Sequence, residues 1–265
     1  MIKIFIVLVL VFYSVFASSI FGPKGKIKAA SFQNNIVVTK VLLAFPSVPP
    51  SLAKRRKVRV EYVKEMKLFA DDELVLQAKL SPYLENRPFL KFVQKNIDAK
   101  RIKLEYSNNY NEKKSVSIKM ANRKRNRDLS KMTFSFFEVD EIFPSKIRFK
   151  DIDKGAVIKM FGDTKFIEKK ISLFAPDLAA NGGSIPLVIR HNIDVKSVTV
   201  FGTTDSYEKM YFICSFDTIG KYKILEYNLR FKMRESGYVQ VVIESKDGKF
   251  YTAHKYIEVA VAGGN

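Results

Sequence analysis

The side chains of this chain alternate between apolar and polar along most of its length, and this pattern constrains the fold more than any other feature. Clear examples are residues 74–80, 102–106 and 238–244. Successive residues of a β-strand point to opposite faces of the sheet, so a period of two indicates strands that are buried on one side. We therefore expect an all-β protein.

The C-terminal part of the chain predicts an immunoglobulin-like sandwich. The alternation restarts after the polar stretch 162–170, and about seven short strands follow within about 95 residues, joined by turns. The turn 245–249, with Asp247 and Gly248 at its centre, is typical of a tight hairpin. The expected strands span residues 171–174, 185–189, 195–201, 210–216, 224–230, 238–244 and 251–261.

The N-terminal part has a similar density of expected strands, so we predict tandem immunoglobulin-like β-sandwiches in domains 19–165 and 170–265. One short helix is expected at 87–97, where Phe89, Leu90 and Val93 fall at helical spacing. Residues 108–111 predict an Asn-rich hairpin turn. The expected strands span residues 36–44, 58–62, 74–80, 102–106, 116–120, 132–136, 147–149 and 157–161.

Residues 1–18 have the features of a secretory signal peptide. Lys3 precedes an unbroken apolar run that ends near Ala17. The alternative is a retained membrane anchor, but the run is shorter than the ~20 residues of a spanning helix. We expect export to the periplasm through the general secretory route, cleavage at Ala17 or Ser19, and no stable membrane anchor afterwards.

The net charge of +19 bears on the choice of partner. Such a field attracts anions, anionic lipid or acidic proteins, whereas nucleic acid is not an expected partner outside the cytoplasm. The alternative is a charge that serves only solubility, because lysines alternate with apolar residues instead of clustering. The sharpest basic run, 122–127, is either a docking site or a solvated loop.

Motifs for catalysis and metal binding are missing from the sequence. No glycine-rich phosphate loop, nucleophile elbow or zinc-protease motif is present. His191 and His254 are isolated, without cysteines or spaced carboxylates, and are therefore a poor metal site. Residues 71–73 are interpreted as turn acids. We expect no enzyme, no metal and no cofactor.

Cys214 is the one cysteine, so an internal disulfide is excluded. It alternates with Ile213 and Ser215 and shares a strand face with Phe212 and Phe216. That pattern favours core packing, because a buried free cysteine behaves as a small hydrophobe. A reactive thiol remains the alternative.

The C-terminal part resembles SoxY, the sulfur-carrier subunit of the thiosulfate-oxidising Sox system. The similar segments are 175–188 (APDLAANGGSIPLV), 245–253 (SKDGKFYTA) and 257–261 (IEVAV). The resemblance covers 171–265 and implies an immunoglobulin-like domain whose last strand leads to a flexible tail. Residues 235–237 and the hairpin also resemble SoxZ, the partner subunit. We hypothesise that the N-terminal domain is a SoxZ-like partner fused in cis.

The chain departs from SoxY at the tail. In that family a Gly-Gly-Cys-Gly-Gly arm holds the sulfur substrate on its cysteine, whereas this chain has Gly263, Gly264 and Asn265. A thiolate is a nucleophile and forms persulfides, but an amide does neither. The covalent carrier role therefore does not transfer to this tail.

Together these features predict a periplasmic, non-enzymatic SoxY- or SoxYZ-like binding or accessory protein. We expect it to associate with a periplasmic protein partner within a sulfur-oxidation or other redox system. An acidic protein is one candidate for this partner. One alternative is a genuine sulfur carrier that uses Cys214. The other is a basic envelope or adhesion protein built on the same scaffold.

Overall fold

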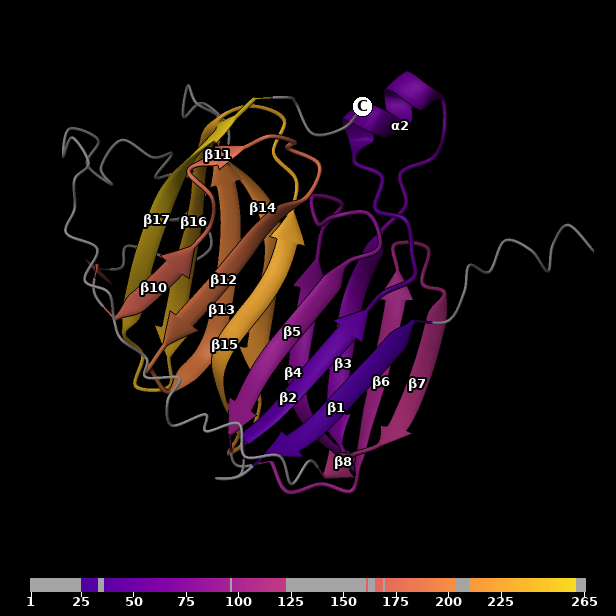
Figure 1. Cartoon of the computed structure of the whole chain (residues 1–265), viewed down its shortest axis with the longest axis vertical. Coiled ribbons are helices and arrows are strands. Elements are labelled where there is room, and N and C mark those ends of the chain that lie inside the picture. Colours follow the sequence, from indigo (N-terminus) through magenta and orange to yellow (C-terminus); the bar gives the residue numbers. More distant parts are fainter. Residues whose placement is uncertain are drawn as a thin grey trace, which may run out of the picture.

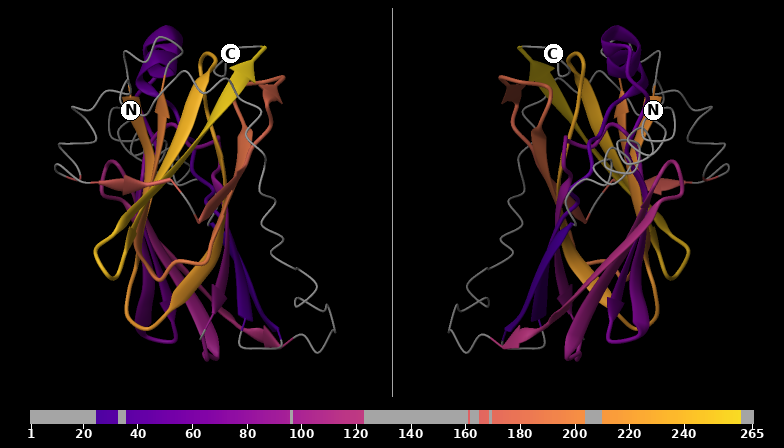
Figure 2. Two further views of the ribbon diagram at one scale, coloured as in Figure 1. Left: turned by 90° about the vertical axis from the view of Figure 1, so that its left-hand side faces the viewer. Right: turned by 90° about the vertical axis from the view of Figure 1, so that its right-hand side faces the viewer.

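The computed structural model describes residues 25–32, 36–95, 97–122, 161, 165–168, 170–203 and 210–260. Within these ranges the chain is mostly β, with two sheets and one short helix, α2 (Pro50–Arg56) (Figure 1). The two sheets face each other as the layers of a sandwich (Figure 2). The all-β prediction is therefore confirmed.

Each sheet contains strands from both the N-terminal and the C-terminal part of the described chain. The first sheet, in spatial order, contains β10 (Ile171–Phe174), β12 (Ile185–His191), β15 (Lys223–Phe231), β5 (Phe89–Lys95), β2 (Ile36–Leu42), β1 (Lys26–Phe32) and β8 (Ala121–Asn122). The second contains β11 (Leu178–Ala179), β17 (Phe250–Val259), β16 (Gly237–Ser245), β13 (Val195–Thr203), β14 (Met210–Thr218), β4 (Glu73–Leu80), β3 (Val63–Ala70), β6 (Arg101–Asn108) and β7 (Lys113–Lys119). Short β9 (Phe166–Ile167) pairs with β17.

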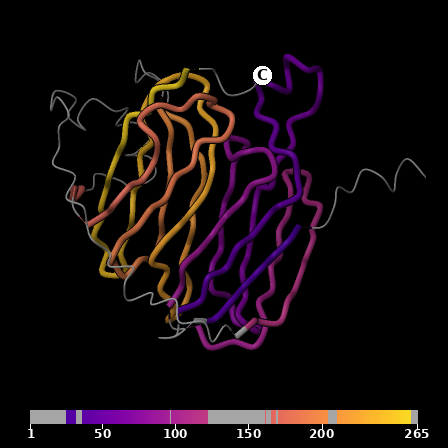
Figure 3. The backbone as a smooth tube through the Cα atoms, in the orientation of Figure 1, coloured from indigo at the N-terminus to yellow at the C-terminus, as the bar shows by residue number. Residues whose placement is uncertain are grey.

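The N-terminal half (β1–β8) and the C-terminal half (β9–β17) are joined edge to edge. In the first sheet β5 pairs with β15, and in the second β4 pairs with β14, both antiparallel. We call these two pairings the seam. Figure 3 shows the indigo-to-magenta half and the orange-to-yellow half side by side. The two halves therefore share both sheets, a feature that the sequence analysis did not include.

The apolar core continues across the seam. Phe92 of β5 packs edge-on against two rings of the C-terminal half, with ring centroids 5.5 Å from Phe216 and 6.0 Å from Tyr227. Those two rings are 5.2 Å apart. All three side chains are fully buried. Edge-to-face geometry is favourable for aromatic rings, so this cluster connects the two halves through their interior.

The helix predicted at 87–97 is wrong, because this segment forms strand β5. Leu90, Phe92 and Gln94 are fully buried while their neighbours are more exposed, which is the period of a strand. β5 lies between β2 and β15 in the sheet. Backbone pairing on both sides therefore overrides a helical spacing that rested on three apolar residues.

The strand expected at 58–62 is also wrong. Only Glu61 pairs there, in an isolated bridge with Val48, and the strand proper, β3, starts at Val63. The loop between β2 and β3 holds α2, which the sequence analysis missed. α2 begins at Pro50, whose fixed φ suits the first helical position, and ends at Arg56, followed by the C-cap Lys57 with φ 53°.

Of the other expected strands, some lie within the described residues and can be compared with the structure, and some lie outside them. The hairpin β6–β7, β4 and the strands of the C-terminal half are confirmed, as is the tight turn, where Gly248 has φ 78°. Expected strands 132–136 and 147–149 lie outside the described residues. So do residues 1–18 and nearly all of the basic run 122–127 and of the expected strand 157–161.

Candidate functional site

The tail positions Gly263, Gly264 and Asn265 lie outside the described residues. The described structure ends one residue after β17, at Ala260. This end of β17 lies at the same end of the sandwich as α2 (Figures 1 and 2).

The end of β17 is held by backbone hydrogen bonds to β11 and the residue before it. Glu258 N–H donates to the Asp177 carbonyl at 2.8 Å, and Ala260 N–H donates to the Ala179 carbonyl at 3.0 Å. Between them, Val259 N–H donates to the hydroxyl of Ser236 at 3.0 Å. The strand that leads to the tail is therefore fixed up to Ala260.

Cys214 lies in the middle of β14 and is fully buried. Its neighbours in register are Leu80 across the seam and Val200 on β13. Burial raises the pKa of the Cys214 thiol well above its ordinary value, because the apolar surroundings disfavour the thiolate. A protonated and inaccessible thiol is a poor nucleophile.

Cys214 is accordingly expected to resist maleimide in the folded protein and to react once the protein is unfolded in urea. The reason is that the reagent reaches the thiol only when the sandwich opens. Intact mass after timed quenching measures the labelled fraction. Rapid labelling in native buffer, at the rate of the unfolded control, would contradict the burial and revive the carrier hypothesis for this thiol.

The two histidines lie in opposite environments. His191, the last residue of β12, is 3% exposed, whereas His254 on β17 is exposed. The Nδ1 atom of His191 accepts a hydrogen bond from Ile193 N–H at 3.3 Å, and its Nε2 atom has no hydrogen-bond partner among the described residues. In that part of the chain, no group of three or more His, Cys, Asp or Glu side chains is placed to hold a metal ion.

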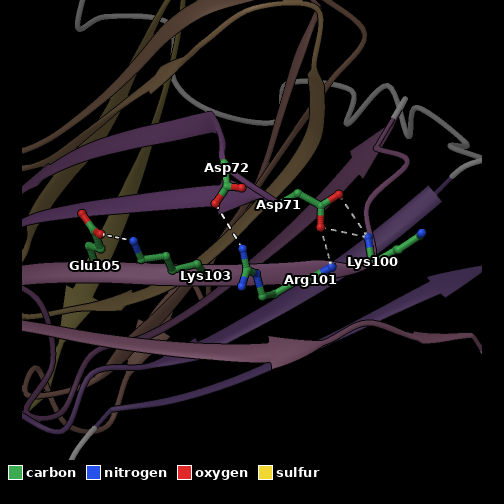
Figure 4. Close-up of polar contacts among 6 residues, drawn as sticks. All are labelled: Asp71, Asp72, Lys100, Arg101, Lys103 and Glu105. Carbon is green, nitrogen blue, oxygen red and sulfur yellow. Dashed lines mark hydrogen bonds and ion pairs between the residues drawn. The ribbon is translucent and has the colours of Figure 1, made fainter.

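The acids of residues 71–73 have structural contacts, and Figure 4 shows those of Asp71 and Asp72. Asp71 has φ 52°, and its carboxylate accepts the backbone N–H of Arg101 at 2.9 Å and of Lys100 at 3.2 Å. Asp72 pairs with the Arg101 guanidinium at 3.1 Å, and the Glu73 carboxylate accepts the Tyr222 hydroxyl across the seam. Asp71 thus closes the β3–β4 turn onto β6.

Glu226 is a buried charge at the seam that the sequence analysis missed. It lies on β15, its side chain is 2% exposed, and it binds Lys91 of β5 at 2.8 Å and Arg190 of β12 at 2.7 Å. Burial alone would raise the pKa of Glu226, but the hydrogen bonds and charges of these two cations together hold it below its ordinary value. The register shift between Ile224 and Glu226 decides which face the side chain takes, and no local pattern signals it.

Lys232 is a second buried charge that joins the halves. Its ammonium donates to the Ser47 carbonyl, and its backbone N–H donates to the Tyr83 carbonyl at 2.7 Å. Burial lowers the pKa of Lys232 to about 8. The negative charge of Glu85 acts in the opposite direction and raises this pKa, but its effect is smaller. These contacts join the segment after β15 to the loops around β4 and α2.

The buried charges and the hydroxyl described above therefore hold the two halves together. Glu226, Lys232 and Tyr222 each bridge the two halves. Cys214 is buried, and His191 is enclosed in the core. No helix in the described part of the chain has the length and apolar character that a membrane span requires.

Comparison with known proteins identifies one family. The sequence profile of the family described as "Sulfur oxidation protein SoxY" matches residues 157–264. No curated protein matches the chain.

Solved structures that match part of the chain include the sulfur carrier protein SoxY from Chlorobium limicola f thiosulfatophilum, at 23% identity over 42% of this chain and 99% of that one, with a TM-score of 0.35. A superoxide reductase (neelaredoxin) from Ignicoccus hospitalis matches at 10% identity over 34% and 80%, with a TM-score of 0.32. A putative superoxide reductase from Thermotoga maritima matches at 12% identity over 43% and 98%, also with a TM-score of 0.32.

The family profile is the finding that identifies the C-terminal half: the chain carries, at residues 157–264, a domain of the SoxY family of sulfur-oxidation carrier proteins.

Proposed function

We propose that this protein is a periplasmic, non-enzymatic binding or accessory protein of a sulfur-oxidation or other redox system. In this proposal residues 1–18 are removed on export, residues 19–165 form a SoxZ-like N-terminal domain, and residues 170–265 form the SoxY-like domain. The N-terminal half then serves as a built-in partner of the SoxY family domain. The protein acts by contact with other proteins and holds no sulfur covalently.

The observation that carries this proposal is the seam. Two strands of the C-terminal half, β14 and β15, have their outer edges covered by β4 and β5. Phe92 fills the core between them, and the buried Glu226 binds Lys91 of the other half. An interface made of two continuous sheets, a shared core and a buried charge resembles the interior of one protein more than a contact between mobile domains.

The covalent-carrier alternative has little support. The tail has Asn265 where the family has its cysteine-bearing arm, and the thiol of Cys214 is buried with a raised pKa. A sulfur carrier must present its sulfur to an enzyme, which a residue in the middle of β14 cannot do without opening the sandwich.

Residues 165–265 expressed alone are expected to aggregate or to remain partly unfolded. Their separation leaves two strand edges unpaired and exposes Phe216 and Tyr227, and such edges promote aggregation. Size-exclusion chromatography and far-UV circular dichroism, with the full chain as the control, measure the effect. A monodisperse, cooperatively folded fragment would count against a built-in partner.

Binding itself is tested with the full chain immobilised in periplasmic extract, followed by identification of the retained proteins. The proposal expects specific retention of a protein partner over a matched blank resin. Retention of nothing specific would contradict a binding or accessory role, whatever the fragment does.

A further inference from the structure

A strongly basic surface lies at the end of the sandwich that carries α2. It consists of five exposed side chains, which we call the basic tip: Lys54, Arg55, Arg56, Lys57 and Arg59. Residues 50–60 contain no acid. Within the described parts of the chain, none of the five has a carboxylate at ion-pair distance.

The backbone holds these charges in place. The bridge between Val48 and Glu61 closes the base of the loop, with Val48 N–H donating to the Glu61 carbonyl at 2.8 Å. Inside the loop, Val58 N–H donates to the carbonyl of Ala53 at 3.0 Å, and Ala53 is buried. The tip is thus ordered before any partner arrives, which lowers the entropic cost of binding.

Tyr110, from the β6–β7 turn, fixes the far side of the tip. Its hydroxyl donates to the Val60 carbonyl at 2.6 Å. The guanidinium of Arg59 lies 4.3 Å from the centre of the Tyr110 ring. This stacking leaves the edge of the guanidinium free to pair with a planar carboxylate, a geometry that arginine favours.

A role in folding alone does not explain the tip. Cations in the last turn stabilise a helix through its dipole, and this accounts for Lys54, Arg55 and Arg56. It does not account for Arg59, which lies beyond the helix and its C-cap, Lys57. Like charges so close together repel each other, and the cost is recovered when an anionic surface neutralises them.

We propose that the basic tip docks an acidic face of a partner protein. The inference rests on the proposed function for the premise that the protein works by binding another protein. α2 protrudes from the sandwich (Figures 1 and 2), and a protruding surface suits an extended acidic face. A membrane surface is the other anionic partner to consider, and Val58, just after α2, is exposed to 52%. A helix that lies on a membrane needs a broad apolar face. α2 lacks such a face, because its Ala53 is buried.

The test uses the full chain and a fluorescein-labelled peptide of ten glutamates as the acidic probe. The tip variant K54Q/R55Q/R56Q keeps good helix formers and removes three charges. The matched control K95Q/K119Q/K221Q removes three exposed lysines outside the tip. Fluorescence anisotropy at low salt is expected to show at least about tenfold weaker binding for the tip variant and less than about twofold for the control.

Each other outcome overturns the proposal. Equal weakening by both variants assigns binding to net charge and not to the tip. Loss of binding to phosphatidylglycerol vesicles in the tip variant, with peptide binding unchanged, assigns the tip to a lipid surface. Circular dichroism of each variant excludes unfolding as the cause. Failure here leaves the proposed function standing, because that is tested separately by the fragment and by retention from periplasmic extract.

Discussion

Replacing Phe92 with alanine is expected to destabilise the whole protein by about 3–5 kcal/mol, as for other fully buried phenylalanines. The side chain is fully buried and packs against Phe216 and Tyr227 of the other half. Its removal therefore leaves a cavity on both sides of the seam. The free energy of unfolding from urea titration, followed by far-UV circular dichroism, measures the loss.

The same variant also tests whether the halves unfold together. Phe92 belongs to the N-terminal half and Cys214 to the C-terminal half. If one core serves both, F92A raises the maleimide labelling rate of Cys214 in native buffer by about a hundredfold or more, since each 1.4 kcal/mol is tenfold in an equilibrium constant. V58A, at a position exposed to 52%, is the matched control and leaves the rate unchanged. An unchanged rate in a destabilised F92A protein would mean that the halves open independently.

Sequence periodicity predicted the strands of the C-terminal half because antiparallel strands with one buried face carry a local signal. The same signal failed at β5, where Leu90 and Val93 fit helical spacing and pairing with β2 and β15 decides the structure. The seam has no local signal at all, since Leu80 and Cys214 are far apart in the sequence and meet only in the folded sheet.

The candidate site likewise has some features with a local signal in the sequence and others without one. The alternation around Cys214 favoured the buried position that the structure shows, whereas the tail positions Gly263, Gly264 and Asn265 lie outside the described residues. Glu226 and Lys232 were not singled out in the sequence, because their burial depends on a register shift and on partners from the other half. Buried charges of this kind become visible only when the partners are known.

Stability is expected to fall by about 3 kcal/mol as the pH is lowered from 6.5 to 4, owing to His191. Burial lowers the pKa of His191 to about 4, because the buried site disfavours the charged imidazolium. Between this value and the unfolded pKa of about 6.5, the unfolded chain binds a proton that the folded chain excludes. The contribution is therefore complete above about pH 6.5 and is lost as the pH falls toward 4.

The variant H191Q separates this effect from other titrations. Glutamine cannot be protonated in this range, and its side-chain oxygen can still accept from Ile193 N–H. Urea midpoints at four pH values between about 4.5 and 7.5 are expected to slope in the parent and in H254Q, and to be nearly flat in H191Q. The pKa of Lys232, about 8, lies outside this window, and the lowered pKa of Glu226 lies below it. Equal slopes in all three proteins would show that His191 is protonated in the fold, which would require an acceptor for its Nε2 proton and access for water to this end of the core.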